Sequence, residues 1–414
     1  MRLFGQIEDH RLRTICIIYS VLILLMISGL RGIANYISFG LLFIVILFYL
    51  GSKGGKLSLK NKTCICIAIF MVFYFFTSLL AFNSNFFFVE YAYYAIAFSP
   101  ALLTYAIVSR NSNKGAITLL KVSLFIWALM CVYSIVLYSI NSGFARLAAA
   151  DQTLTTGIFF GGYPFSIGSA ILSVYLFSLI WGRQHFFSRK LKFLIIIGCV
   201  LLFVVIILTE STTTTICAIV GILASIFLND RGRDTQYKPL KILLFCVAVF
   251  VTYIIINNNL DSIHSWLNEH SNQLFFYRLK EVLNAVFYDD QTRHFAKRSD
   301  TIFESLSTFL KNPVLGVGYK YGNVTSIGRA QYGIGNHSEI FDALAQFGIV
   351  GSVPFLMTYY LSVKSFASKY VGVVITLIML MVFNPFFYFD SSLIVFLIIP
   401  LSEFVLKKNS ESNI

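Results

Sequence analysis

The residues Asn336-His337-Ser338-Glu339 precede an apolar stretch long enough to enter a membrane, and they are the first candidates for chemistry. We predict Asn336 as the N-cap of the helix that follows, with Glu339 three residues later in the second position of a capping box. His337 would then lie in the first turn, where the positive end of the helix dipole disfavours an imidazolium. A neutral imidazole can accept a proton, as a general base must. The alternative is that His337 is an interfacial polar residue that only caps a helix.

Two glycines continue this pattern into the apolar stretch. Gly348 and Gly351 follow His337 by 11 and 14 residues, close to three and four helical turns, so we expect them on the same helix face. Small residues at such positions let a neighbouring helix approach closely. A second glycine-rich element stands just upstream of the histidine: Asn312-Pro313-Val314-Leu315-Gly316-Val317-Gly318.

Together the two elements resemble those of a known family. His337-Ser338, nine residues and Gly348-x-x-Gly351 are similar to the H-[NSQ]-x9-G-x-x-G signature of the O-antigen ligase and O-antigen polymerase superfamily. Residues 312–318 resemble the N-P-x-x-G-x-G element that precedes this signature. The resemblance implies an inverting glycosyltransferase without a cofactor, in which His337 is catalytic and its neighbours support it: Asn336, Ser338, Glu339, Gly348 and Gly351. The outer segments have no D-x-D-like cluster, so we predict that the reaction is metal-independent.

The same resemblance implies the substrates and the setting. The donor would be a sugar chain on undecaprenyl pyrophosphate and the acceptor a single repeat unit on the same carrier. The protein would then be an O-antigen polymerase of the bacterial inner membrane, in contact with membrane lipids and with a chain-length-regulating co-polymerase. The alternatives are an O-antigen ligase, which transfers the chain to lipid A core, and a polysaccharide flippase or other transporter.

One departure from the family pattern favours the polymerase. Ligases of the superfamily often carry an arginine at the start of a central helix, in a T-x-[ST]-R-like context. Here Thr209-Glu210-Ser211-Thr212 has a threonine at the corresponding place. We therefore predict that other basic residues bind the pyrophosphate. Glu210 could position an acceptor hydroxyl, but we favour the alternative that it caps the helix beginning at Ser211.

Arginines are suited to this role because a planar guanidinium binds phosphate groups bidentately and stabilises the negative charge that grows on a leaving group. Arg146 lies in a short gap between apolar runs that has no other basic residue, where its alternative role is to anchor lipid headgroups. In the long polar segment we expect two or three basic residues to serve, Arg298 foremost, among Arg278, Arg293, Lys297, Arg298 and Arg329.

The composition requires a membrane to position these residues. Of 414 residues, 57% are hydrophobic and only 12% are charged, against about a quarter charged in soluble domains. The net charge of +13 comes from basic residues in short gaps between apolar runs; this is the positive-inside pattern, which argues against nucleic-acid binding. All seven cysteines lie inside apolar runs, so neither a disulfide framework nor a zinc site is predicted.

Apolar runs of membrane-spanning length predict an all-α protein of about twelve transmembrane helices, and the family resemblance implies that its fold is GT-C-like. We predict spans at 14–31, 36–51, 62–82, 88–109, 116–140, 157–181, 191–209, 212–228, 239–257, 342–362, 371–388 and 391–406. Basic gaps alternate along this series and share one side with Arg11, Arg13, Lys407 and Lys408. Both termini are therefore predicted in the cytoplasm.

Three parts follow from these spans. Residues 1–257 form a membrane domain of nine helices, residues 258–341 a large periplasmic loop, and residues 342–414 a membrane domain of three helices. Apolar spacing predicts helices in the first half of the loop and another from Ser299 until Asn312 and Pro313 stop it. We expect the loop to fold over the membrane domain as a lid.

Overall fold

The computed structural model is built from α-helices and has no strand in the residues that it describes, which are 14–23, 61–80, 84–140, 163–182, 187–209, 211–228, 238–270, 274–287, 293–318, 334–335 and 337–412. The first described helix is Thr14–Ile23. The others are α4 (Lys62–Leu80), α5 (Ser84–Ser109), α6 (Asn113–Ile140), α8 (Tyr163–Gly182), α9 (Arg189–Leu208), α10 (Thr212–Leu228), α11 (Lys238–Asn258), α12 (Leu260–Glu269), α13 (Leu274–Phe287), α14 (Arg293–Lys311), α16 (Glu339–Lys364), α17 (Val371–Phe383), α18 (Phe389–Leu393), the π-helical η3 (Ile394–Ile398) and α19 (Ile399–Ser412).

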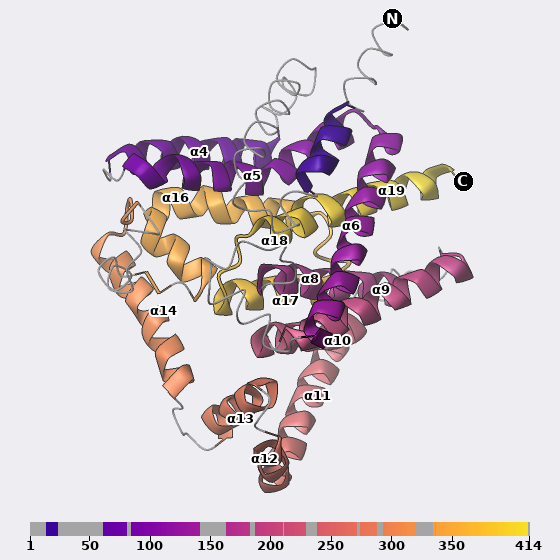
Figure 1. Ribbon diagram of the computed structural model, residues 1–414, viewed down its shortest axis with the longest axis vertical. Helices are drawn as coiled ribbons and strands as arrows, with labels where there is room; N and C mark the ends of the chain where they lie inside the picture. Colours follow the sequence, from indigo (N-terminus) through magenta and orange to yellow (C-terminus); the bar gives the residue numbers. More distant parts are fainter. Residues whose placement is uncertain are drawn as a thin grey trace, which may run out of the picture.

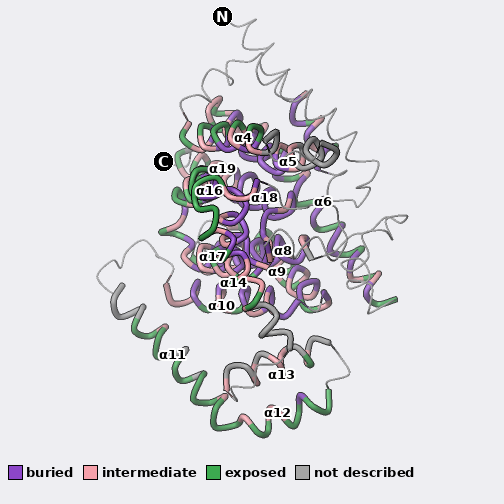
Figure 2. The backbone as a smooth tube through the Cα atoms, turned by 90° about the vertical axis from the view of Figure 1, so that its left-hand side faces the viewer, coloured by how far each residue is buried: buried purple, intermediate pink, exposed green. Residues whose placement is uncertain are grey.

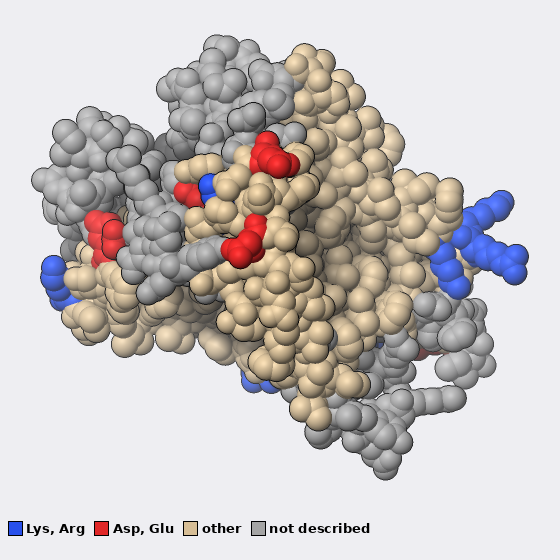
Figure 3. All heavy atoms as spheres, turned by 90° about the horizontal axis from the view of Figure 1, so that it is seen from below, with Lys and Arg blue, Asp and Glu red and all other residues tan. Residues whose placement is uncertain are grey.

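This architecture confirms an all-α polytopic membrane protein. Within the described residues, five helices are long and apolar enough to cross a membrane, and shorter apolar helices accompany them. Most predicted spans coincide with an observed helix, but the span at 36–51 lies outside the described residues. In the view from below, a broad surface with few charged side chains separates the Lys and Arg at one end from the rest, as a membrane protein requires (Figure 3).

The helices form a bundle from which one arm projects. α4, α5 and α16 run side by side along one edge, and α8, α9, α10 and α17 pack beneath them (Figure 1). α11 points away from this bundle and carries α12 and α13, as both views show (Figures 1 and 2). Its apolar side chains, among them Leu243, Val247 and Phe250, are exposed in the isolated chain, as expected of a helix that meets lipid.

Small residues and hydroxyls hold the bundle together. A Cβ on Gly372 of α17 would fall on the backbone oxygen of Gly221 in α10, and the Ser178 and Ser225 hydroxyls bond each other at 2.8 Å between α8 and α10. Such close approach is how helices associate where lipid removes the hydrophobic driving force.

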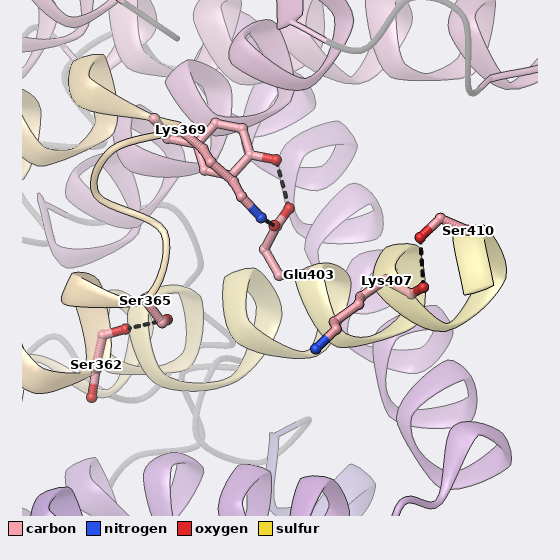
Figure 4. Close-up of polar contacts among 7 residues, drawn as sticks. Ser362, Ser365, Lys369, Glu403, Lys407 and Ser410 are labelled. Atoms are coloured by element: carbon pink, nitrogen blue, oxygen red, sulfur yellow. Dashed lines mark hydrogen bonds and ion pairs between the residues drawn. The ribbon is translucent and has the colours of Figure 1, made fainter. Parts of the chain in front are cut away.

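A polar contact joins α17 to α19 at the same, N-terminal end of α17. Glu403 of α19 accepts a hydrogen bond from Tyr370 at 2.5 Å and pairs with Lys369 at 3.4 Å (Figure 4). The charge pattern assigns the gap that holds Lys369 and the C-terminus to the same side of the membrane. The cytoplasmic orientation of that side remains a prediction.

An aromatic cluster fills the bundle behind the start of α16. Phe70 and Tyr94 lie edge-on to Phe347 at centroid distances of 5.0 and 5.8 Å, and Tyr94 stacks on Phe387 at 4.9 Å. These rings come from α4, α5, α16 and the segment after α17, and all are buried. The cluster therefore gives the two glycine-containing elements a rigid backing.

Candidate functional site

The N-terminus of α16 begins two residues later than predicted. Ser338 is the N-cap, with extended backbone (φ −145°, ψ 119°) and a hydroxyl that accepts a hydrogen bond from the Phe341 N–H at 3.4 Å. The prediction of Asn336 as the cap is wrong, and that residue lies outside the description. His337, which is half-buried, precedes the cap instead of lying in the first turn. The argument for a neutral imidazole from a first-turn position therefore does not hold.

Glu339 does not complete a capping box either. Its carboxyl accepts hydrogen bonds from the backbone N–H groups of Phe386 and Phe387 at 2.8 and 3.0 Å, and its own N–H donates to the Asn384 carbonyl at 3.1 Å. The carboxyl is buried and is used to cap the segment after α17 rather than its own helix. Together with the Ser338 hydroxyl, which donates to the Met381 carbonyl at 3.3 Å, it fastens the start of α16 to the end of α17.

Asp342 is a site residue that the sequence analysis missed. Its Oδ1 accepts a hydrogen bond from the Ser305 hydroxyl of α14 at 2.6 Å, and its Oδ2 accepts one from the Ser338 N–H at 3.3 Å. The Ser305 hydroxyl in turn accepts from the Gly335 N–H at 2.9 Å. The available signal was a carboxylate at the start of a membrane span, where ionisable side chains are rare and usually functional.

α16 is broken at Gly348, which corrects the expected alignment of the glycines with His337. Gly348 has φ 59° and ψ −168°, a conformation that an L side chain rarely adopts. The chain changes direction there, so spacing along a continuous helix no longer relates Gly348 and Gly351 to the histidine. The break also frees backbone groups that an unbroken helix would have paired.

The upstream element fills this break. The N–H groups of Val317 and Gly318 donate to the carbonyls of Ala345 and Gln346 at 3.0 and 2.8 Å. In the other direction, the Ile349 and Val350 N–H groups donate to the Pro313 and Val314 carbonyls at 2.8 and 3.2 Å. We call this double set of bonds between residues 313–318 and 345–350 the clasp.

Glycines are needed in the clasp because two backbones meet without room for a side chain. A Cβ on Gly316 (φ 66°) would fall on the Gln346 carbonyl, and one on Gly348 would fall on the Val314 carbonyl. Gly351 is different, because a Cβ there would fall on the Phe73 ring of α4. The predicted close approach of a neighbouring helix is therefore found at Gly351, whereas Gly348 admits the upstream element.

The structure places the backbone of three predicted arginines. Arg278 lies on α13, and Arg293 and Arg298 lie on α14, with Arg298 two helical turns before Ser305. The side chains of these three arginines are not among the parts that the structure describes. Arg146 and Arg329 lie entirely outside the described residues. Their binding role therefore stays a prediction. In the described part of the chain, no group of His, Cys, Asp and Glu residues is large enough for a metal site.

α14 begins at Arg293, six residues before the predicted start, and ends at Lys311, before Asn312 and Pro313 as predicted. One face of α14 lies against the rest of the protein, since Ser305 and Thr308 are buried, and partial burial raises the pKa of Glu304 beside them above its usual value.

Comparison with known proteins identifies one family. The profile of the O-antigen ligase family matches residues 197–356, a segment that runs from α9 past the break in α16 and includes α14, His337 and the clasp. A search of curated proteins finds no match to the chain.

Proposed function

We propose, on the premise that this chain is a member of the O-antigen ligase and O-antigen polymerase superfamily, that it is a membrane glycosyltransferase joining lipid-linked oligosaccharide repeat units, with His337 as the general base. The observation that carries the proposal is the clasp. It joins the upstream element to the glycine end of the histidine signature by four backbone hydrogen bonds, about two to three helical turns after His337.

In the proposed reaction, the His337 imidazole takes the proton from an acceptor sugar hydroxyl while that oxygen attacks the anomeric carbon of the donor. The new glycosidic C–O bond forms as the bond from the anomeric carbon to the pyrophosphate oxygen breaks. The electron pair leaves with undecaprenyl pyrophosphate, and the configuration at the anomeric carbon inverts. Arginines from the set Arg146, Arg278, Arg293 and Arg298 would stabilise the leaving group.

The polar environment of the helix start supports this assignment. Buried carboxyls and backbone amides surround the residues beside His337, while α16 continues as a helix apolar enough to span a membrane. A lipid-linked substrate needs this arrangement, because its polyprenyl tail stays in the bilayer while its sugar reaches water. The proposed localisation is the bacterial inner membrane, with the site at the periplasmic face and both termini in the cytoplasm.

A polymerase is favoured over a ligase by the junction of α9 and α10. Thr209 is the C-cap of α9, and its hydroxyl donates to the Ile206 carbonyl at 2.7 Å. The Ser211 and Thr214 hydroxyls bond each other at 2.6 Å. The residue at the place where ligases often carry an arginine is Thr212, which begins α10 and is buried.

The deciding experiment is reconstitution. Purified protein in lipid vesicles should convert undecaprenyl-pyrophosphate-linked repeat units into a ladder of longer chains. A strain lacking the gene should carry lipopolysaccharide capped with one repeat unit. Lipopolysaccharide without any repeat unit would instead identify a ligase, and reconstituted protein that moves lipid-linked units across the bilayer without extending them would identify a flippase.

A further inference from the structure

The four residues Gly335 to Ser338 are held at both ends by the same pair of side chains. At the C-terminal end, the Ser338 N–H donates to Asp342 Oδ2 at 3.3 Å. At the N-terminal end, the Gly335 N–H donates to the Ser305 hydroxyl at 2.9 Å, and that hydroxyl donates to Asp342 Oδ1 at 2.6 Å. His337 lies between the two anchored amides.

These contacts are shielded from water. Asp342 is 1% exposed and Ser305 is fully buried. A buried carboxyl is costly unless its oxygens accept hydrogen bonds, and here each oxygen has a donor. The hydrogen bond from the Ser305 hydroxyl to Asp342 Oδ1 is short at 2.6 Å, as hydrogen bonds to carboxyl oxygens are.

Helix α14 lies directly against the segment that holds Gly335. A Cβ on Gly335 would fall on the backbone oxygen of Thr301, one turn before Ser305 on α14, so the segment runs flush along the helix. The position of the histidine backbone therefore depends on where α14 lies.

Helix capping explains only one of these bonds, from the Ser338 N–H to Asp342, which is similar to the second half of a capping box. The Ser338 hydroxyl already caps the Phe341 N–H, and Glu339 with Asn384 already joins α16 to the segment after α17. The Ser305 hydroxyl acts on other groups, since it accepts from the Gly335 N–H and donates to Asp342 Oδ1, so the N-cap amide and the Gly335 amide are tied to one pair of side chains.

We infer that Asp342 and Ser305 are positioning residues, which fix the His337 peptide and make its placement depend on the seating of the loop helix α14. We call Gly335, Ser305, Asp342 and Ser338 the clamp. The inference rests on the proposed function only because it assigns a reaction to His337, whereas the clamp follows from the hydrogen bonds alone.

The test uses Ser305→Ala, which removes one hydroxyl from the clamp. The control is Thr308→Val, which removes one hydroxyl from the next turn of the same buried face and leaves the clamp intact. Hydrogen exchange followed by mass spectrometry in vesicles reports the Gly335 and Ser338 amides, and reconstituted activity on lipid-linked repeat units reports kcat and KM.

For Ser305→Ala we expect exchange at 334–339 to rise about fivefold, the factor for one hydrogen bond of about 1 kcal/mol. Exchange at the clasp amides of Val317 and Gly318 should stay unchanged. We expect kcat to fall between about tenfold and a hundredfold, with KM within about twofold, because small misplacements of a catalytic group affect the chemical step. Asp342→Asn should act in the same direction on both readouts.

Unchanged exchange at 334–339 in both clamp variants would overturn the clamp. Faster exchange with a kcat equal to that of Thr308→Val would overturn the positioning role. Failure of the proposed function would appear elsewhere, as full activity of a His337→Ala variant, and would leave the exchange result untouched.

Discussion

The two halves of the long loop are built differently. The second half, α14, has Ser305 and Thr308 buried and bonds through Ser305 to the start of α16. The first half, α12 and α13, buries Leu267 but leaves Trp266 47% exposed. It is held by ring contacts of its own, with Trp266 4.5 Å from His270 and 5.1 Å from Phe276, and it lies with α11 away from the bundle (Figure 2).

This difference indicates that the two halves of the loop have different roles. α14 forms part of the frame of the candidate site, because its displacement would break bonds beside His337. α12 and α13 form a satellite attached to α11, where the Tyr253 and Phe287 rings stack at 5.2 Å. Changes in the two halves should therefore have unequal effects on activity.

The largest contrast is expected between two histidines. His337→Ala should lower kcat by about a hundredfold to ten-thousandfold, the range that a general base contributes. His270→Ala, on the satellite, should leave kcat within about twofold. Reconstituted ladder formation from lipid-linked repeat units measures both. Equal losses in the two variants would contradict these different roles, and an active His337→Ala would contradict the proposed base.

The clasp should be the next most sensitive feature. Gly348→Ala places a side chain on the Val314 carbonyl, in an extended conformation with positive φ that only glycine adopts readily and that costs other residues about 1–3 kcal/mol. We expect a lower thermal midpoint and little activity. The matched control is Gly198→Ala in α9, where the new Cβ meets Leu176 at an ordinary 3.5 Å. Thermal unfolding in detergent gives the midpoint of each variant. Equal midpoints for Gly348→Ala and Gly198→Ala would show that the break in α16 does not require glycine.

Much of the fold could be predicted because it follows from apolar length and from charge alternation. The helix start at α16 could not, because Asn336, Ser338 and Glu339 all have side chains that can cap, and tertiary bonds decide among them. Glu339 caps the segment after α17, which no local pattern encodes. The break at Gly348 was missed for a similar reason: glycine spacing fits a continuous helix equally well, and only the bonds to residues 313–318 stabilise the kink.

A smaller effect is expected from the satellite. Trp266→Ala removes the ring that packs on both His270 and Phe276, so α12 and α13 should exchange their amides faster. The Gly335 amide, which donates to Ser305, should keep its exchange rate. The rate of ladder formation should stay within about threefold of the parent, because the lost contacts, about 0.5–1.5 kcal/mol per aromatic pair, lie far from His337. Faster exchange at Gly335 would show that the two halves are coupled.

The smallest effect concerns the seating of α14 itself. Burial raises the pKa of Glu304 above its ordinary value of 4.5, so the folded chain holds this proton more tightly than the unfolded chain does. The contribution of Glu304 to stability is therefore present below its ordinary pKa and is lost as the pH rises through the raised value. Glu304→Gln should then give a slightly higher thermal midpoint than the parent at neutral pH, and the gain should vanish near pH 4. A gain that persists unchanged in acid would mean that desolvation of the carboxylate is not its cause, and a loss at neutral pH would mean that favourable contacts of the carboxylate outweigh its desolvation.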